Sequence, residues 1–177
     1  FLHPFALVYG TQGSAEETDQ LLRSAQSIAR LYWRRANASP QVLADVEVGD
    51  DLQRTHQLVL LGSPARNLLT RQLMPTFPIT IETETETETE YVRFGARRLH
   101  GDLGVAMVYP NPKYPERLVA VFAGTSIARG TQALTFQPLY SGAAIPDYVI
   151  FEEAVRKVGW GGVVEAGVFD AEWRLVP

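Results

Sequence analysis

The sequence predicts an α/β fold whose front half is a parallel β-sheet and whose back half carries antiparallel strands. Short apolar runs alternate with helical patterns in the first half, which is typical of β-α-β units. In the second half a short Pro-Asn-Pro linker separates two apolar runs and is too short for a parallel crossover. With 177 residues, 46% of them hydrophobic and 20% charged, the chain fits a single α/β domain spanning residues 1–177.

The chain opens with a strand followed by a long helix. Phe5–Tyr9 is a short apolar run that predicts a buried strand. Ser14 and Glu17 have the spacing of a capping box, in which the hydroxyl and the carboxylate each accept from a backbone N–H at the helix start. Apolar residues at helical spacing then predict a helix over Ala15–Arg35, which the segment Asn37–Pro40 ends.

Two further strands and two helical segments follow. The alternation over Val42–Val48 predicts a strand, and Asp50–Thr55 predicts a single helical turn. Gln57–Leu61 is a continuous apolar strand. Ser63-Pro64 has the residue types of an N-cap and a first helical position, so a second helix is expected there, ending before Pro75. The order β-α-β-α-β-α implies a parallel sheet.

The back half predicts an antiparallel hairpin and two more strands. Gly104–Tyr109 and Leu118–Ala123 are apolar strands that the short linker joins as a hairpin. A helix is expected over Thr125–Leu134. Tyr148–Phe151 and Val163–Phe169 are short strands.

A glutamate–threonine tract, Thr80–Glu90, lies between the two halves and carries Glu at every second position from 82 to 90. Within the extended segments Ile79–Glu90 and Tyr91–Leu99, period two places all five glutamates on one face. We interpret the row as a solvated edge strand whose charge opposes edge-to-edge pairing. A carboxylate ladder for Ca²⁺ or a basic partner is the alternative. Three arginines are placed to neutralise part of the row across a hairpin: Arg93, Arg97 and Arg98.

The charge and the composition exclude several classes of protein. The net charge of −4 argues against nucleic acid and against an anionic membrane as partners. The apolar runs are of strand length, far below the roughly 18 residues of a transmembrane helix. The absence of Cys excludes disulfides and thiolate metal sites. Because the chain starts at Phe1 without a signal-peptide pattern, we expect a piece of a longer, exported protein.

No catalytic motif stands out. The histidines are His3, His56 and His100, and neither a Gly-x-Ser-x-Gly elbow nor a His-Glu-x-x-His motif is present. We therefore expect no catalytic residues and no metal in this chain. Trp33 is expected to pack beside the helix stripe, whereas Trp160 and Trp173 leave open a carbohydrate-binding module as an alternative.

Ligands of open α/β sheets bind outside the carboxyl ends of the strands, where three Gly-led loops are expected. These are Gly10–Ser14, Gly62–Asn67 and Gly124–Ser126, whose hydroxyls and N–H groups serve equally as turns and caps. The candidate ligand-binding residues, all expected at one end of the sheet, are Thr11, Ser14, Asn67, Asn111, Ser126 and Asp147. Asp147 is expected to be the one charged group there, and in a closed pocket its carboxylate must be paired or protonated.

Residues Tyr9–Glu17 read Tyr-Gly-Thr-Gln-Gly-Ser-Ala-Glu-Glu, which resembles the phosphate loop of flavodoxin-like FMN domains. Gln57–Pro64 resembles the third strand of that family and its loop. One Thr that the family carries after Gln12 is missing, which shortens the loop. The resemblance implies FMN as a cofactor, with Tyr109 and Tyr140 available to flank the flavin, and an FMN-binding electron carrier is therefore an alternative; otherwise no cofactor is expected.

Six motifs stand in order along most of the chain: Pro4–Thr11, Leu58–Pro64 with Asn67, Val108–Pro112, Ala123–Ser126, Pro146–Phe151 and Ala166–Trp173. Together they are similar to a C-terminal accessory domain that follows the α/β-hydrolase module in large exported bacterial esterase or prolyl-oligopeptidase-like proteins. The resemblance implies a Rossmann/flavodoxin-like three-layer sandwich without an active site. It also implies a parent that is an extracellular or periplasmic serine hydrolase, with the catalytic hydrolase domain as the partner that this domain packs against or presents substrate to.

Overall fold

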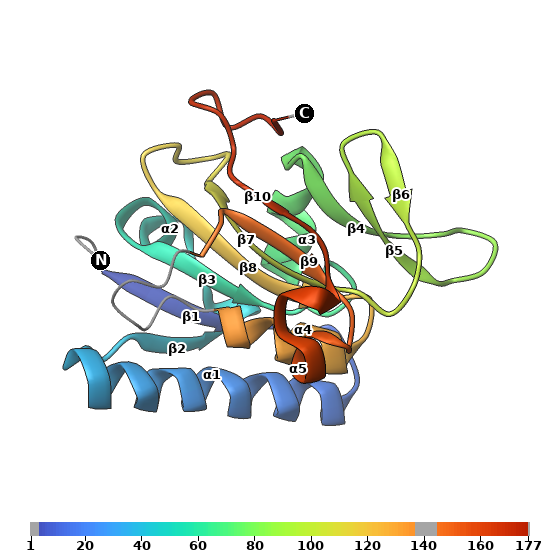
Figure 1. Cartoon of the computed structure of the whole chain (residues 1–177). Helices are drawn as coiled ribbons and strands as arrows, with labels where there is room; N and C mark the ends of the chain where they lie inside the picture. Colours follow the sequence, from blue (N-terminus) through green and yellow to red (C-terminus); the bar gives the residue numbers. More distant parts are fainter. Residues whose placement is uncertain (1–3, 137–144, 177) are drawn as a thin grey trace.

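The computed structural model describes residues 4–136 and 145–176, which form a mixed α/β fold around two sheets (Figure 1). The larger sheet has seven strands in the order β10-β9-β7-β8-β3-β1-β2. Its strands are β1 (Phe5–Tyr9), β2 (Gln41–Ala44), β3 (Gln57–Leu61), β7 (Gly104–Pro110), β8 (Leu118–Gly124), β9 (Tyr148–Phe151) and β10 (Val163–Gly167). The smaller sheet is antiparallel and consists of β4 (Ile79–Thr83), β5 (Glu90–Phe94) and β6 (Arg97–Leu99).

Five α-helices and four 3₁₀ turns connect these strands in the described residues. The helices are α1 (Ala15–Ala36), α2 (Asp50–Thr55), α3 (Leu68–Leu73), α4 (Ile127–Gln132) and α5 (Val155–Val158). The 3₁₀ turns are η1 (Asp45–Glu47), η2 (Met74–Thr76), η3 (Ala133–Phe136) and η4 (Gly159–Gly162).

The predicted division of the sheet is confirmed. Strands β2, β1, β3 and β8 are parallel neighbours. Strands β8, β7, β9 and β10 follow with antiparallel pairing. The β7–β8 hairpin is paired from Gly104↔Gly124 to Pro110↔Leu118, as the short linker predicts.

Helix α1 has the predicted start. The Ser14 hydroxyl accepts from the backbone N–H of Glu17, and the Glu17 carboxylate accepts from that of Ser14, which completes the capping box. The buried stripe of the helix, which packs on the sheet, consists of Leu21, Ala25, Ile28 and Tyr32. Trp33 lies beside this stripe but is 64% exposed, so the packing role predicted for it is wrong.

The two faces of the large sheet are covered differently. Along β1, Leu7 packs with the α1 stripe, whereas Ala6 and Val8 pack with residues of α3 and of the small sheet. This alternation is the period of two expected of a strand buried on both faces. In Figure 1, α1 and α4 accordingly lie below the large sheet, while β4, β5 and β6 extend to the upper right.

The second strand ends earlier than its alternation predicts. β2 stops at Ala44, and Asp45–Glu47 forms the turn η1 instead of continuing to Val48. The Glu47 carboxylate accepts from the backbone N–H of Ala44 at 2.8 Å, and the Asp45 carboxylate accepts from groups of other loops. These acceptors hold the chain in the turn, so the apolar pattern alone overestimates the strand.

The predicted helix at Ser63-Pro64 is also displaced. The backbone N–H groups of Arg66 and Asn67 bond to the carbonyl of Ser63, so this segment is a turn. Helix α3 begins at Leu68 because the Asn67 side chain accepts from the N–H groups of Leu69 and Thr70 and so acts as the N-cap.

The two expected elements at the back are shorter than predicted. Helix α4 begins after its N-cap Ser126 and passes into η3, which replaces the last turn of the helix expected over Thr125–Leu134. Strand β10 ends at Gly167, and Phe169 forms an isolated bridge with Leu175.

The glutamate–threonine tract is a hairpin and not one continuous strand. β4 ends at Thr83, the N–H of Glu88 bonds to the carbonyl of Glu84, and the chain returns at Glu90 into β5. The expected single-faced row of five carboxylates is therefore wrong. Arg93 pairs with Glu82 at 2.6 Å, as the tract predicts, but Arg97 pairs with Glu165.

We expect Gly104→Ala to destabilise the fold by about 1–3 kcal/mol, because an added Cβ lies 2.1 Å from the Cζ atom of the buried Phe151 ring. Urea unfolding measures the effect. Gly49→Ala is the matched control, since nothing lies within 4 Å of its added Cβ. In a double-mutant cycle, Phe151→Leu is expected to cost less in the Gly104→Ala background than in the wild type. Equal costs in the two backgrounds would contradict the close contact.

A second prediction concerns acid stability. Hydrogen bonds from Tyr91, Arg93 and Thr80 lower the pKa of Glu82 from 4.5 to about 2. The unfolded chain therefore binds a proton at Glu82 before the folded chain does, and stability falls as the pH drops from about 4.5 toward 2. Glu82→Gln is expected to destabilise at pH 7 and to approach the wild type at pH 2.5, measured by urea unfolding. Glu86→Gln, at the exposed tip, controls for loss of charge.

Candidate functional site

The six predicted site residues are divided between the two ends of the large sheet. Those that follow the parallel strands β1, β3 and β8, at their carboxyl ends, are Thr11, Ser14, Asn67 and Ser126. Asn111 follows β7, which is antiparallel to β8, and Asp147 precedes β9, which is antiparallel to β7. These two residues lie at the opposite end, so the expectation that all six share one end is wrong.

The first loop is fastened to the buried carboxylate of Asp45, which is 2% exposed. Its oxygens accept from the Thr11 hydroxyl at 2.5 Å, from the Thr11 backbone N–H at 3.2 Å and from the N–H of Leu68 at 2.6 Å. A buried carboxylate requires such donors. Asp45, in the turn after β2, therefore joins the loop after β1 to the start of α3.

Asn67 fixes the second loop and is fully buried. Its side-chain nitrogen donates to the carbonyls of Val8 and Leu61, at the ends of two neighbouring strands, while its oxygen caps α3. The first loop lies so close that a Cβ at Gly10 would be 2.2 Å from the carbonyl oxygen of Arg66. Glycine is therefore required at position 10.

An ion-pair cluster covers these two loops. The Arg66 guanidinium lies 2.7 Å from Glu17 and 2.6 Å from Glu90, and it donates to the Ser63 hydroxyl at 2.8 Å. The backbone N–H of Ser14, followed by Arg66, lowers the pKa of Glu17. One cation thus joins α1, the loop after β3 and the small sheet.

The third loop is held in a similar way. The Ser126 hydroxyl donates to Asp102 at 2.6 Å and accepts from the N–H of Arg129, which makes it the N-cap of α4. Arg129 is 8% exposed, bonds to the same carboxylate at 2.8 Å and also contacts Gln132. The Thr125 hydroxyl donates to the Gly101 carbonyl.

Most backbone N–H groups of the first loop, Gly10–Ser14, already donate hydrogen bonds within the protein. The loop is therefore a poor candidate for binding an anion. The N–H groups of Gly10, Thr11, Gln12 and Ser14 donate to Leu61, Asp45, Arg66 and Glu17, respectively. A phosphate would have to displace these bonds and would meet three carboxylates beside one arginine. The Gly-led loop therefore serves the fold as a turn and a cap.

The opposite end contains the other two predicted residues. Asn111 is fully buried, and its side-chain oxygen accepts from the N–H of Lys113 within the β7–β8 turn. The Asp147 carboxylate accepts from the N–H of Phe169 at 2.9 Å and is half-buried, so it does not sit in the closed pocket that would require it to be paired or protonated. It borders an apolar cavity of about 230 Å³, together with Tyr32 and Phe136. Burial raises the pKa of Tyr32 to about 12.

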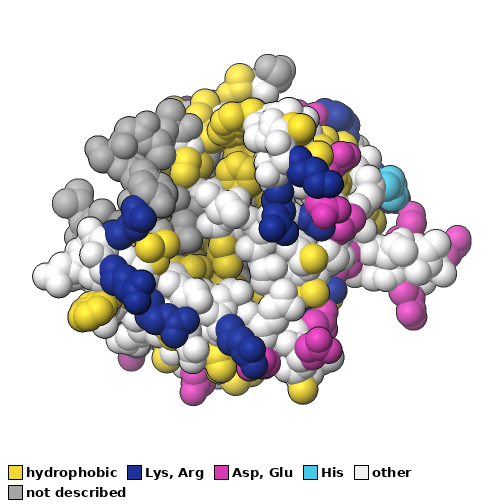
Figure 2. Space-filling view, turned by 60° about the horizontal axis from the view of Figure 1, so that its bottom comes forward, with side chains coloured by type: hydrophobic (Ala, Val, Ile, Leu, Met, Phe, Trp, Pro, Cys, Tyr) yellow, Lys and Arg dark blue, Asp and Glu magenta, His cyan; other side chains and the backbone are white. Residues whose placement is uncertain are grey.

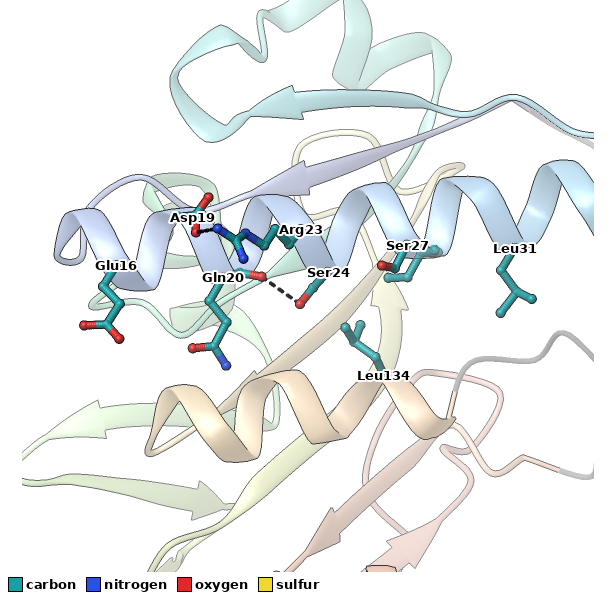
Figure 3. A pocket seen from close by; sticks show the side chains of 9 residues that line it. Glu16, Asp19, Gln20, Arg23, Ser24, Ser27, Leu31 and Leu134 are labelled. Atoms are coloured by element: carbon teal, nitrogen blue, oxygen red, sulfur yellow. Dashed lines mark hydrogen bonds and ion pairs between the residues drawn. The ribbon is translucent and has the colours of Figure 1, made fainter.

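A polar groove of about 510 Å³ runs between α1 and η3. Figure 3 shows Ser24, Ser27 and Leu134 pointing into the space between the two segments. Its polar groups bond locally, since the Ser24 hydroxyl donates to the Gln20 carbonyl and Arg23 pairs with Asp19 at 2.8 Å. The groove thus presents few free groups for recognising a ligand.

Sequence reasoning missed the charged residues that organise these loops, which are Asp45, Arg66, Asp102 and Arg129. Their partners are distant along the chain: 34 residues separate Asp45 from Thr11, and 49 separate Arg66 from Glu17. No local signal marked them: Asp45 falls with Glu47 on the polar face of the predicted strand, where a charge is ordinary. The interpretations of His3 and Tyr140 concern positions outside the described residues.

No family model matches the chain. A stretch of 72 residues, 41% of the chain, is 32% identical to part of the "Uncharacterized secreted protein" of Arthroderma benhamiae. The match spans 8% of that relative's length, so the chain covers only a small part of that protein. Among the described residues, no helix has the length and apolar character needed to cross a membrane, and no group of three or more His, Asp or Glu side chains is placed to hold a metal ion.

We expect Asn67→Ala to destabilise the protein by about 3 kcal/mol, because it removes an N-cap and two buried hydrogen bonds to the carbonyls of Val8 and Leu61. Ser14→Ala removes only an exposed cap and is expected to cost about 1 kcal/mol. Urea unfolding of both variants measures the difference. Similar losses would show that the bonds to Val8 and Leu61 contribute little.

Proposed function

We propose that the chain is a non-catalytic accessory domain of a longer, secreted serine hydrolase, and that it packs against the catalytic domain or presents substrate to it. The observation that carries the proposal is that the polar groups of the strand-end loops already form hydrogen bonds and ion pairs within the domain. Asp45, Asn67 and Arg66 consume the donors and acceptors that an active site at this position would need. The secreted relative, of which the match covers 8%, supports a long extracellular parent.

The proposed fold type is a Rossmann- or flavodoxin-like three-layer arrangement. An FMN-binding role receives less support than the accessory role, because the loop that resembles a phosphate loop has its N–H groups bonded internally. Tyr109, a candidate for flanking flavin, packs instead among Phe77, Phe169 and Trp173.

A carbohydrate-binding role also receives less support. Trp173 belongs to that same aromatic cluster, whereas Trp160 is 59% exposed. A single exposed indole does not make a stacking platform. It does suit a surface that packs on a partner domain, because other exposed apolar side chains occur in the neighbouring segments: Val158 at the end of α5, Val164 in the edge strand β10 and Val168 just after it.

The proposal is tested by labelling the full-length parent protein with a fluorophosphonate probe and mapping the modified serine. We expect one labelled serine, located outside these 177 residues, and no labelling of the isolated chain above a heat-denatured control. A label within this chain would refute the non-catalytic role, and an unlabelled parent would refute the serine hydrolase. Flavin absorbance in the purified chain would favour the electron carrier.

A further inference from the structure

The three asparagines of the chain differ in their access to solvent. Asn67 and Asn111 are fully buried, whereas Asn37 is exposed. Asn37 also stands in the run Asn37-Ala38-Ser39, which has the Asn-x-Ser/Thr pattern of an N-glycosylation acceptor. Neither buried asparagine has Ser or Thr two residues later. The exposed asparagine is therefore also the one that carries the acceptor pattern.

Asn37 lies at the point where helix α1 ends. Its backbone is left-handed, with φ 49° and ψ 35°, and its N–H donates to the carbonyl of Tyr32. The N–H of Ala38 donates to the same carbonyl at 3.4 Å. Asparagine is one of the few residues besides glycine that adopt this conformation readily. The backbone thus fixes the position of Asn37, while its carboxamide makes no hydrogen bond within the described residues.

The hydroxyl of the pattern lies in the short segment 37–40, which joins α1 to β2. Ser39 is exposed. The residue before a proline favours extended backbone, so Pro40 keeps Ser39 out of the helix. Within residues 4–136 and 145–176, the Ser39 hydroxyl makes no hydrogen bond. Both side chains that the acceptor pattern requires are therefore presented to solvent on a non-helical segment.

The end of α1 is a polar part of the surface. Figure 2 brings α1 forward and shows a row of Lys and Arg side chains across the left half of this face. The exposed arginines of the helix are Arg23, Arg30, Arg34 and Arg35. In Figure 1 the C-terminal end of α1 lies at the left of the molecule, whereas β10 and α5 lie to its right. A glycan on Asn37 therefore extends into water, away from the exposed apolar side chains of the β10 region.

We propose that Asn37 is an N-glycosylation site. In the reaction, the Nδ2 atom of Asn37 forms a bond to C1 of the first sugar and loses a proton. The lipid diphosphate that carried the oligosaccharide leaves with the electron pair of the broken C1–O bond. The inference rests on the secreted location in the proposed function and not on the serine hydrolase activity, because the lipid-linked donor is met only on the route out of the cell.

A glycan at this position also restricts where the domain contacts the rest of its parent. An N-linked glycan is bulky and solubilising, so the end of α1 that carries it must face solvent in the full-length protein. A neighbouring domain must then pack against another face. The apolar side chains near β10, Trp160 and Val164 among them, are separated from that end of α1 and stay available. The glycosylation site and the proposed packing surface therefore do not compete.

The first test expresses the 177-residue chain with a secretion signal in yeast. We expect the secreted chain to migrate more slowly on a gel and to return to the size of the bare polypeptide after treatment with peptide-N-glycosidase F. Ser39→Ala should abolish this shift, and Ser39→Thr should keep it, since either hydroxyl satisfies the pattern.

Thr85→Asn, made in the Ser39→Ala background, is the matched control. It creates an Asn-Glu-Thr pattern at the exposed tip of the β4–β5 hairpin, so it should restore the shift. A secreted wild-type chain without the shift, beside a control that has it, overturns the proposal. A shift that Ser39→Ala leaves unchanged overturns it as well.

The second test uses the full-length parent from its native producer. Trypsin cleaves after Arg35 and Arg54, and the resulting peptide 36–54 has Asn37 as its only asparagine. Digestion with the glycosidase in heavy-oxygen water converts a glycosylated Asn37 into a labelled aspartate, which we expect mass spectrometry to find. An unlabelled peptide from a secreted parent overturns this inference alone. A parent confined to the cytosol overturns the secreted location that both proposals share.

Discussion

The side chain of Asn67 is the point at which the strand-end loops are joined. It donates to the carbonyls of Val8 near the end of β1 and Leu61 at the end of β3 and caps α3, so two strands and a helix share one buried amide. The arrangement also demands glycine at position 10, where the backbone of Arg66 occupies the place of a side chain. Because the loops are fastened in this way, α3 is fixed in position beside β4, and the end of the sheet that commonly holds ligands is occupied by structural bonds.

The buried arginines also join different elements of the fold. Arg66 and Arg129 are largely enclosed and neutralise carboxylates that join different elements, namely Glu17, Glu90 and Asp102. Enclosed pairs of this kind are weak evidence for net stability, because each charge must first lose its water. Glu86 and Glu88, by contrast, are exposed at the tip of the β4–β5 hairpin, where water solvates them.

The sequence patterns correctly predicted those elements whose structure depends on residues that are close together in the chain. The capping box at Ser14, the helix that follows it and the antiparallel β7–β8 hairpin all depend on residues close together in the chain. The errors arose where distant partners decide the outcome. The early end of β2 depends on Asp45 meeting Thr11 and Leu68, and the turn at Ser63 depends on Asn67 capping α3 and bonding to two strands. The candidate site residues were chosen by loop position, and antiparallel pairing moved Asn111 and Asp147 to the other end.

The edge strands of a sheet are a separate feature from the loops at the ends of its strands. In a strand edge the backbone itself carries unpaired donors and acceptors, and natural proteins protect such edges with charge, with bulges or with a covering segment. Strand β10 has a bulge between Val163 and Glu165, and it pairs Glu165 with Arg97. β4 is buried from Ile79 to Ile81, beside the α3–η2 segment, and its charges stand beyond the strand at Glu84, Glu86 and Glu88. The exposed end of this edge is therefore protected by charge, because like charges on a second copy of the hairpin oppose edge-to-edge pairing.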